Sequence, residues 1–157
     1  MFAPILLYPS LELRRRCDPV SDRDIKSGDA VRWACQMMES MEAGNGIGLA
    51  APQIGILKRL IAIKVLTPKH GWGGVMLNPV IVNKSELKTV YKEGCLSFPD
   101  KFIDVERPAV ITVTYNDING HGKVEIFQDL AAKCIQHEID HLDGILFIDH
   151  ERKENGQ

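Results

Sequence analysis

The chain has 157 residues, of which 45% are hydrophobic and 25% charged, as is typical of one globular domain with a buried core. Its net charge of −2 and the lack of a nucleic-acid motif argue against nucleic-acid binding, and its apolar runs are too short to cross a membrane. Because the N-terminal apolar stretch precedes its basic residues, the reverse of a secretory signal, we predict a cytoplasmic protein that forms a single domain over residues 1–157.

The first predicted element is a helix over residues 27–42. Its apolar residues recur at helical spacing, and the predicted buried face consists of Val31, Ala34, Cys35, Met38 and Met41. The Gly-Asn-Gly sequence at residues 44–46 is expected to end this helix.

Four short runs with the character of β-strands follow, at residues 59–66, 75–82, 109–117 and 123–127. The third run alternates apolar and polar residues, as a strand with one buried face does. Asn119 and Gly120 between the last two runs are typical of a hairpin turn. Trp72, in the sequence HGWGG, is expected in a loop.

A second helix is predicted from Asp129 to Leu142, with Asp129 as its N-cap and Gly144 as the residue that stops it. The order of helix, strands and helix predicts an α+β fold. In this fold antiparallel β-sheets pack around the C-terminal helix, and the first helix is an N-terminal addition.

The segment QHEIDHLDG, residues 136–144, lies on the second helix. His137 and His141 are four residues apart, so both imidazoles project from one helix face and can reach one small cation. Glu138 can reach a water molecule near that cation, which is the HExxH arrangement of two metal ligands and a general base. The apolar residues around this motif predict burial, where a histidine needs a partner such as a metal.

A catalytic metal site generally has three protein ligands and one open position. Only 16 residues follow His141, and Asp149 and Glu151 among them are poor candidates, so the third ligand is expected upstream. Cys95, in EGCLSFP, is the best candidate, because Gly94 permits close backbone approach and a thiolate binds iron or zinc strongly. An inert buried cysteine is the alternative.

Two other functions fit parts of this pattern. A metallopeptidase would share HExxH and cleave internal peptide bonds, but the upstream cysteine and the absence of a downstream ligand disfavour it. A structural-zinc or peptide-binding module would close its site with four protein ligands. Only three good ligands are present, and Glu138 would have no structural purpose there.

Three segments, GIGLAAPQIG (46–55), EGCLS (93–97) and QHEIDHLDG (136–144), resemble in order and spacing the signature blocks of the peptide deformylases, and EGCLS resembles their type 1 form. The resemblance extends over nearly the whole chain. It implies a metallo-amidase that removes the formyl group from the formylmethionyl N-termini of nascent polypeptides and releases formate. It also implies one divalent metal bound by Cys95, His137 and His141, natively Fe(II), with zinc, nickel or cobalt able to occupy the site.

The resemblance implies roles for further residues. The backbone N–H of Leu96 and the side-chain amide of Gln53 would stabilise the oxyanion, while Glu138 acts first as base and then as proton donor. The segment Gly46-Ile47-Gly48 would hold the peptide by close backbone approach, with Gly48 among the catalytic positions. The methionine side chain needs an apolar pocket, and the candidate residues are Ile47, Phe98, Leu130 and Cys134. Packing in the core is an equally good explanation for Leu130 and Cys134.

Asp140 flanks the histidine face and is expected to support the ligands rather than to bind the metal. A basic partner lowers the cost of burying such a carboxylate, and Arg107 falls where the resembling family often has an arginine. Glu93 is expected to join this network. The alternative is that all three are surface charges.

Three features depart from the usual pattern of the resembling family. Lys133 stands where an apolar pocket residue is common, and Phe102 stands where many bacterial members have an arginine. The chain ends soon after its final motif, as organellar and bacteriophage forms do, so an organelle is the alternative location. The ribosome is a candidate partner, although the helix that supports docking in some members is not seen.

Overall fold

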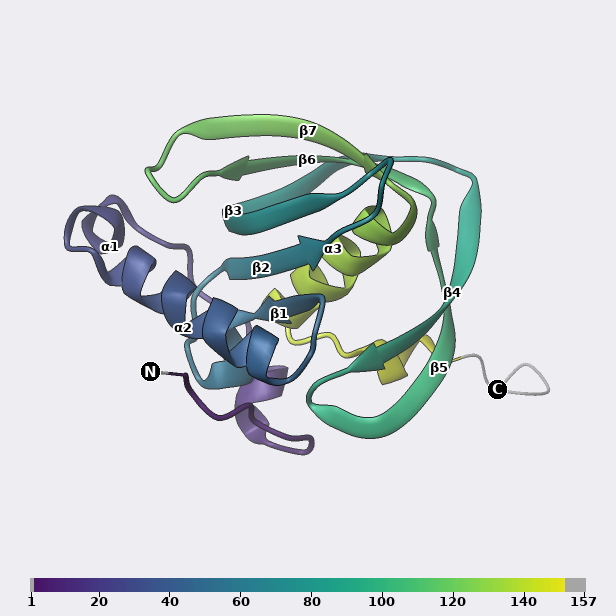
Figure 1. Cartoon of the computed structure of the whole chain (residues 1–157), viewed down its shortest axis with the longest axis horizontal. Helices are drawn as coiled ribbons and strands as arrows, with labels where there is room; N and C mark the ends of the chain where they lie inside the picture. The colour runs from purple at the N-terminus through teal and green to yellow at the C-terminus, as the bar shows by residue number, and fades with distance from the viewer. Residues whose placement is uncertain (1, 152–157) are drawn as a thin grey trace.

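The computed structural model describes residues 2–151, and Figure 1 shows the arrangement of its elements. A five-stranded sheet and a two-stranded sheet, both antiparallel, surround one C-terminal helix, α3 (Asp129–Leu142). This confirms the predicted α+β architecture. Within the described range, no helix combines the length and the apolar character that a membrane crossing requires.

The N-terminal segment forms a short 3-10 helix, η1 (Leu11–Arg14), and two α-helices, α1 (Asp22–Lys26) and α2 (Asp29–Ala43). The prediction of one helix starting at residue 27 is wrong there, because Gly28 adopts φ +86° and separates the two helices. The predicted apolar face is also partly wrong, since Val31 and Cys35 are exposed and Met38 is half-buried. The apolar residues that α2 buries are Ala30, Ala34, Met37 and Met41.

The five-stranded sheet has the order β1 (Gly48–Ala50), β2 (Leu60–Val65), β3 (Trp72–Lys84), β6 (Val110–Asn116) and β7 (Gly122–Gln128). The four predicted runs and the hairpin turn are confirmed, with Gly120 at φ +86°. Trp72, expected in a loop, instead begins β3, and its ring packs edge-to-face on Tyr115 and Phe127. The neighbouring glycines concealed this strand end, because glycine weakens any strand signal.

The two-stranded sheet is a hairpin of β4 (Lys88–Cys95) and β5 (Phe98–Pro108). Neither strand was among the predicted runs, because the buried positions Glu93 and Arg107 are charged and interrupt the apolar alternation. The register shifts after Gly94, and Cys95 then pairs with Phe98 across a two-residue turn. This turn places Cys95 at the end of the hairpin, near α3.

Helix α3 begins and ends where the sequence predicts. Asp129 is its first residue rather than its N-cap, because Gln128 occupies the cap position and makes no side-chain cap bond. Gly144 follows the helix at φ +71° and lies against the backbone of Arg14. The helix crosses the concave side of the large sheet, contacting β1 and β2 (Figure 1). Its apolar residues in the core are Ala131, Ala132, Cys134, Ile135, Ile139 and Leu142.

Candidate metal centre and active site

His137, Glu138 and His141 are all buried on α3, with 6%, 4% and 1% of their surface exposed. The two imidazoles lie on one side of the helix because they are four residues apart, and their ring centroids are 5.2 Å apart. Helical spacing alone therefore produces the predicted pair.

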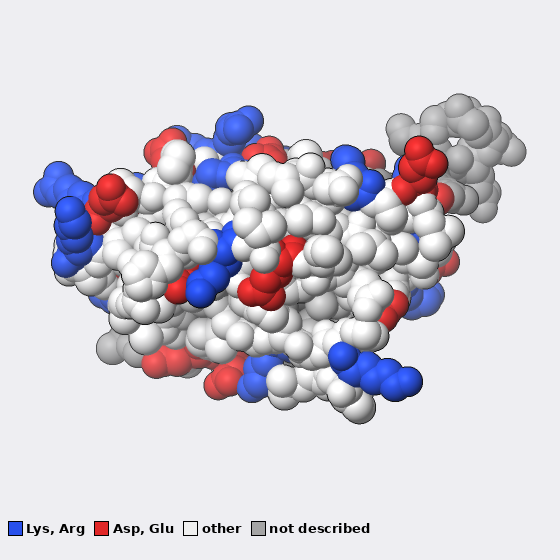
Figure 2. Space-filling view, turned by 90° about the horizontal axis from the view of Figure 1, so that it is seen from above, with Lys and Arg blue, Asp and Glu red and all other residues white. Residues whose placement is uncertain are grey.

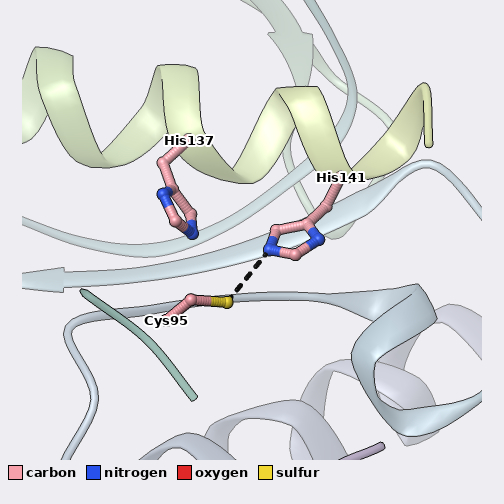
Figure 3. A group of neighbouring side chains, drawn as sticks. All are labelled: Cys95, His137 and His141. Atoms are coloured by element: carbon pink, nitrogen blue, oxygen red, sulfur yellow. Dashed lines mark hydrogen bonds between the residues drawn. The ribbon is translucent and has the colours of Figure 1, made fainter. Parts of the chain in front are cut away.

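Cys95 joins the two histidines from the end of β4. Its Sγ lies 3.4 Å from His141 Nε2, and the ligand atoms of all three residues lie within 4.8 Å of one another. Figure 3 shows the three side chains pointing toward a common point from the helix and the hairpin. One thiol and two imidazoles form a donor set that suits a transition-metal ion such as iron or zinc.

Glu93 orients His137 from behind. Its Oε1 lies 2.7 Å from His137 Nδ1, which leaves Nε2 as the ring nitrogen available to a metal. Arg107 donates to both oxygens of Glu93, from Nε at 2.5 Å and from Nη2 at 3.0 Å. Burial alone would raise the pKa of Glu93, but the hydrogen bonds from His137 and Arg107 lower it to about 2. The carboxylate is thus ionised and fixed.

Asp140 completes this network on the outer side. It accepts a hydrogen bond from Arg107 Nη1 at 3.0 Å, so the expected association of Asp140, Arg107 and Glu93 is present in the structure. His150 Nε2 lies 2.9 Å from the same Asp140 oxygen. His150 was not predicted, because it lies in a separate 3-10 helix, η3 (Phe147–His150), outside every motif.

Burial and hydrogen bonding together set the protonation of the groups around the centre. It lowers the pKa of His141 well below its usual range, so this imidazole is neutral and able to act as a ligand. Burial opposes protonation of His137 as well, but the hydrogen bonds with Cys95 and Glu93 raise its pKa to about 10. Coordination of a cation would displace that proton, so metal binding and proton release are coupled.

Gln53 reaches the centre from η2 (Ala51–Ile54), the turn that follows β1. Its Oε1 accepts from the backbone N–H of Ala50 at 2.9 Å, which directs Nε2 toward Ser97 Oγ at 3.1 Å and Cys95 Sγ at 3.5 Å. The side chain is buried and its amide orientation is fixed. Ser97 was not predicted, although it lies in the EGCLS motif two residues after Cys95.

Two glycines allow the chain to pass close to the centre. A Cβ at Gly48 would lie 2.7 Å from both Cys134 Sγ and Glu138 Oε1. A Cβ at Gly46 would lie 2.7 Å from the Leu96 side chain. A side chain at either position would collide with the site. The absence of one therefore permits the close backbone approach expected there.

A cleft of about 550 Å³ opens beside the centre. Among the predicted site residues that line it are Gly46, Ile47, Gly48, Gln53, Cys95, Leu96, Phe98, Cys134, His137 and Glu138. Leu130 lies apart from them and lines a neighbouring hollow together with Gly46 and Ile47. Lys133 and Phe102, the two departures noted in the sequence, also line the cleft.

Known proteins match this chain along nearly its whole length. Residues 2–157 match the family model described as polypeptide deformylase. A peptide deformylase of Rhizobium meliloti strain 1021 is 46% identical over 150 residues, which cover 94% of this chain and 83% of the relative. A peptide deformylase of Synechocystis is 43% identical over 147 residues, covering 90% and 79%.

Solved structures show the same likeness. The class I type b peptide deformylase from Acinetobacter baumannii superposes with a TM-score of 0.92 at 35% identity, covering 96% of this chain and 99% of that one. A probable peptide deformylase from Synechococcus phage S-SSM7 superposes with a TM-score of 0.83 at 44% identity, covering 93% and 97%.

Proposed function

Because this chain belongs to the peptide deformylase family, we propose that it hydrolyses the formyl group from formylmethionyl N-termini at a metal held by Cys95, His137 and His141. The observation that carries this assignment is the convergence of one thiol and two imidazoles within 4.8 Å, beside the buried Glu138 on the wall of a cleft. A structural-metal module would close its site and would not need a buried carboxylate facing the cleft.

We propose Fe(II) as the native metal, with zinc, nickel and cobalt as ions that the same ligands accept. A thiolate with two imidazoles suits several of these ions, so the preference for iron follows the family resemblance rather than the donor set. When bound, such a cation supplies Lewis acidity, which lowers the pKa of a coordinated water and polarises a carbonyl oxygen.

In this proposal Glu138 moves the protons. Its Oε2 is buried and has no hydrogen-bond partner among residues 2–151. Burial raises the pKa of Glu138 to about 7, so this carboxyl group can accept and return a proton near neutral pH. Oε2 takes a proton from the attacking water and delivers it to the amine nitrogen as the C–N bond breaks.

Gln53 and Leu96 are proposed to stabilise the oxyanion that develops on the formyl oxygen. The Gln53 amide is already oriented by Ala50, with Nε2 directed toward Cys95, so only its longer contact, with the sulfur, has to be exchanged for one with the oxyanion. Leu96 directly follows Cys95 in the β4–β5 turn, which places a backbone N–H next to the thiolate.

The peptide itself is proposed to lie along β1, the terminal strand of the large sheet. An extended peptide can add to such an edge through backbone hydrogen bonds. Gly48 keeps this edge close to Glu138, as its missing side chain shows. The methionine side chain would then contact the apolar cleft residues Ile47, Phe98 and Cys134, while Leu130 supports Ile47 from the neighbouring hollow.

We further propose that the chain acts in the cytoplasm on formylated nascent chains. The relatives of Rhizobium and Synechocystis described above are bacterial, which supports this location. Contact with the ribosome is not needed for the reaction proposed.

The decisive test is formate release from a formyl-Met-Ala-Ser peptide by protein prepared without oxygen and loaded with Fe(II) or Ni(II). The native chain should release formate, and Glu138→Gln should retain the metal and lose roughly 100- to 10,000-fold in rate, the usual contribution of a general base. A peptide blocked at both ends, which a metallopeptidase would cleave, should remain intact. Metal-loaded native protein that releases no formate would refute the proposal.

A further inference from the structure

Ser97 is a buried polar residue beside the centre to which the proposed reaction assigns no role. It follows Leu96 in the turn between β4 and β5, and only 1% of its surface is exposed. Gln53, equally buried, comes from η2 and donates from Nε2 to Ser97 Oγ at 3.1 Å. This hydrogen bond joins the two segments that carry the proposed oxyanion donors, Gln53 and Leu96.

The hydrogen-bonding capacity of Gln53 shows what Ser97 contributes. A glutamine amide has one carbonyl oxygen and two N–H donors. Oε1 accepts from the Ala50 N–H at 2.9 Å, and exchanging the two ends of the amide would set a nitrogen against that donor. Nε2 lies 3.1 Å from Ser97 Oγ and 3.5 Å from Cys95 Sγ. Ser97 therefore engages one N–H of Gln53 and leaves the other on the side of the metal ligand.

The contact with Ala50 does not by itself fix the position of Nε2. The terminal torsion of glutamine is soft, so an amide held only at Oε1 can turn about that contact. Sulfur is a weak acceptor, and the contact with Cys95 opposes such rotation less than the bond with Ser97 does. The two strong hydrogen bonds, at opposite ends of the amide, together define its plane.

The backbone around Ser97 is itself anchored. The Tyr8 N–H donates to the backbone oxygen of Ser97 at 2.9 Å, and the Leu6 N–H donates to the backbone oxygen of Gln53 at 2.7 Å. The N-terminal segment thus connects the β4–β5 turn to η2. The Tyr8 ring also stacks on Phe98, with ring centroids 4.8 Å apart. Because its backbone is held in this way, the Ser97 hydroxyl is a fixed reference for the Gln53 side chain.

We propose that Ser97 is a positioning residue, whose hydroxyl holds Gln53 Nε2 so that its second N–H meets the oxyanion. The inference rests on the proposed function, because it takes the role of Gln53 as an oxyanion donor from it. The oxyanion charge is greatest in the transition state, so a displaced donor lowers kcat and leaves KM nearly unchanged. The effect of Ser97 should also require Gln53, through which it acts.

The test is a double-mutant cycle measured by formate release from formyl-Met-Ala-Ser. Gln53→Ala should lower kcat by roughly 100- to 1,000-fold, as loss of an oxyanion donor does. Ser97→Ala, which displaces this donor without removing it, should lower kcat by roughly 5- to 50-fold. In the Gln53→Ala background, Ser97→Ala should change kcat by less than about two-fold. An equal loss in both backgrounds, or a rise in KM at unchanged kcat, would overturn the proposal.

Ser40→Ala is the matched control. Ser40 is also 1% exposed, and its Oγ accepts from the Ala3 N–H at 3.0 Å and donates to the Ala3 carbonyl at 2.7 Å. It lies on α2, outside the cleft. Removing this hydroxyl should cost stability and leave kcat unchanged. A similar fall in kcat in Ser40→Ala would mean that general loosening, rather than the position of Gln53, explains the effect of Ser97.

These exchanges replace one uncharged residue by another. They therefore preserve the mixture of positive and negative side chains that Figure 2 shows on one face of the molecule. Any electrostatic steering of the substrate by the surface is preserved as well. A change in rate consequently reports on the site and not on the encounter with the peptide.

A spectroscopic measurement separates this inference from the reaction itself. In zinc-loaded protein labelled with nitrogen-15, the side-chain amide signals of Gln53 are identified by their loss in Gln53→Ala. Ser97→Ala should shift these signals, because one N–H loses its acceptor, and Ser40→Ala should not. Unshifted signals in Ser97→Ala would refute the role of Ser97, even with normal formate release. Shifted signals in a metal-loaded protein that releases no formate would support the contact and refute the proposed function.

Discussion

Two arginine–carboxylate pairs in this fold have nearly the same hydrogen-bond distances in very different surroundings. Arg107 donates to the two oxygens of Glu93 at 2.5 and 3.0 Å, and Arg14 donates to the two oxygens of Asp149 at 2.6 and 3.0 Å. The side chains of the first pair are 6% and 0% exposed, and those of the second are 41% and 37% exposed. Hydrogen-bond distances therefore do not distinguish the two pairs, whereas burial does.

The difference determines what each pair can do. The Arg107–Glu93 pair sits in a low-dielectric region, where loss of one partner leaves an uncompensated charge, and Glu93 also holds His137. The Arg14–Asp149 pair links η1 to η3 near the surface, where solvent and salt weaken it. A buried pair can thus fix a proposed metal ligand, while an exposed pair with similar distances only joins two segments.

The largest effect is expected when Glu93 is replaced by alanine. Arg107 would lose its principal partner inside the protein, which costs about 3–5 kcal/mol of unfolding free energy. His137 would lose its orienting acceptor, and metal affinity should fall by roughly 10- to 100-fold. Urea denaturation of the metal-free protein and chelator competition measure the two effects separately. Asp149→Ala is the matched control, and a stability loss of similar size there would remove the distinction drawn between the pairs.

A double variant separates the ion pair from its service to the metal. Replacing Glu93 by leucine and Arg107 by methionine removes both charges and keeps much of the volume. Stability should recover by about 2 kcal/mol relative to Glu93→Leu alone, because no unpaired guanidinium remains. Metal affinity should stay low, because His137 still lacks its acceptor. If the stability losses of Glu93→Leu and Arg107→Met simply added up to the loss of the double variant, the coupling between these residues would be disproved.

The same contrast explains how far the sequence could predict this site. His137, Glu138 and His141 lie in one helical motif, so their local spacing fixes their relation before any tertiary contact is known. Cys95 could be proposed as a ligand because the coordination shell needed a third donor. Its placement, however, depends on the β4–β5 register shift. The pattern of apolar residues did not predict this hairpin, because some of its inward-facing positions are charged.

Other features could not be predicted from local pattern at all. His150 and Ser97 reach the network through tertiary contacts with Asp140 and Gln53, and neither residue type carries a distinctive signal at its position. The error at the face of α2 has a similar origin. Two overlapping rows of apolar residues have helical spacing, and only the contacts of the folded chain select the row that contains Met37.

A smaller effect is expected at the exposed pair. Asp149→Asn removes the charge while retaining an oxygen that can accept from the Leu146 N–H, which now lies 3.0 Å from Asp149 Oδ2. The cost should be at most about 1 kcal/mol and should diminish at high salt. Metal affinity should not change, because neither Arg14 nor Asp149 touches a ligand. Denaturation at two salt concentrations tests this, and a loss that is insensitive to salt would contradict the assignment of a screened pair.

The smallest expected effect is the pH dependence of that same pair. The hydrogen bond from Arg14 lowers the pKa of Asp149 in the folded protein. A carboxyl group with a lowered folded pKa contributes stability above its unfolded pKa, about 4, and loses this contribution as the pH falls further toward the folded pKa. The stability difference between the native chain and Asp149→Asn should therefore be constant from about pH 7 to pH 5 and shrink below about pH 4. Unfolding curves of both proteins across this range measure it. A difference that grew on acidification would mean that Asp149 is stabilised in its protonated form, and the Arg14 pair would then not be its main interaction.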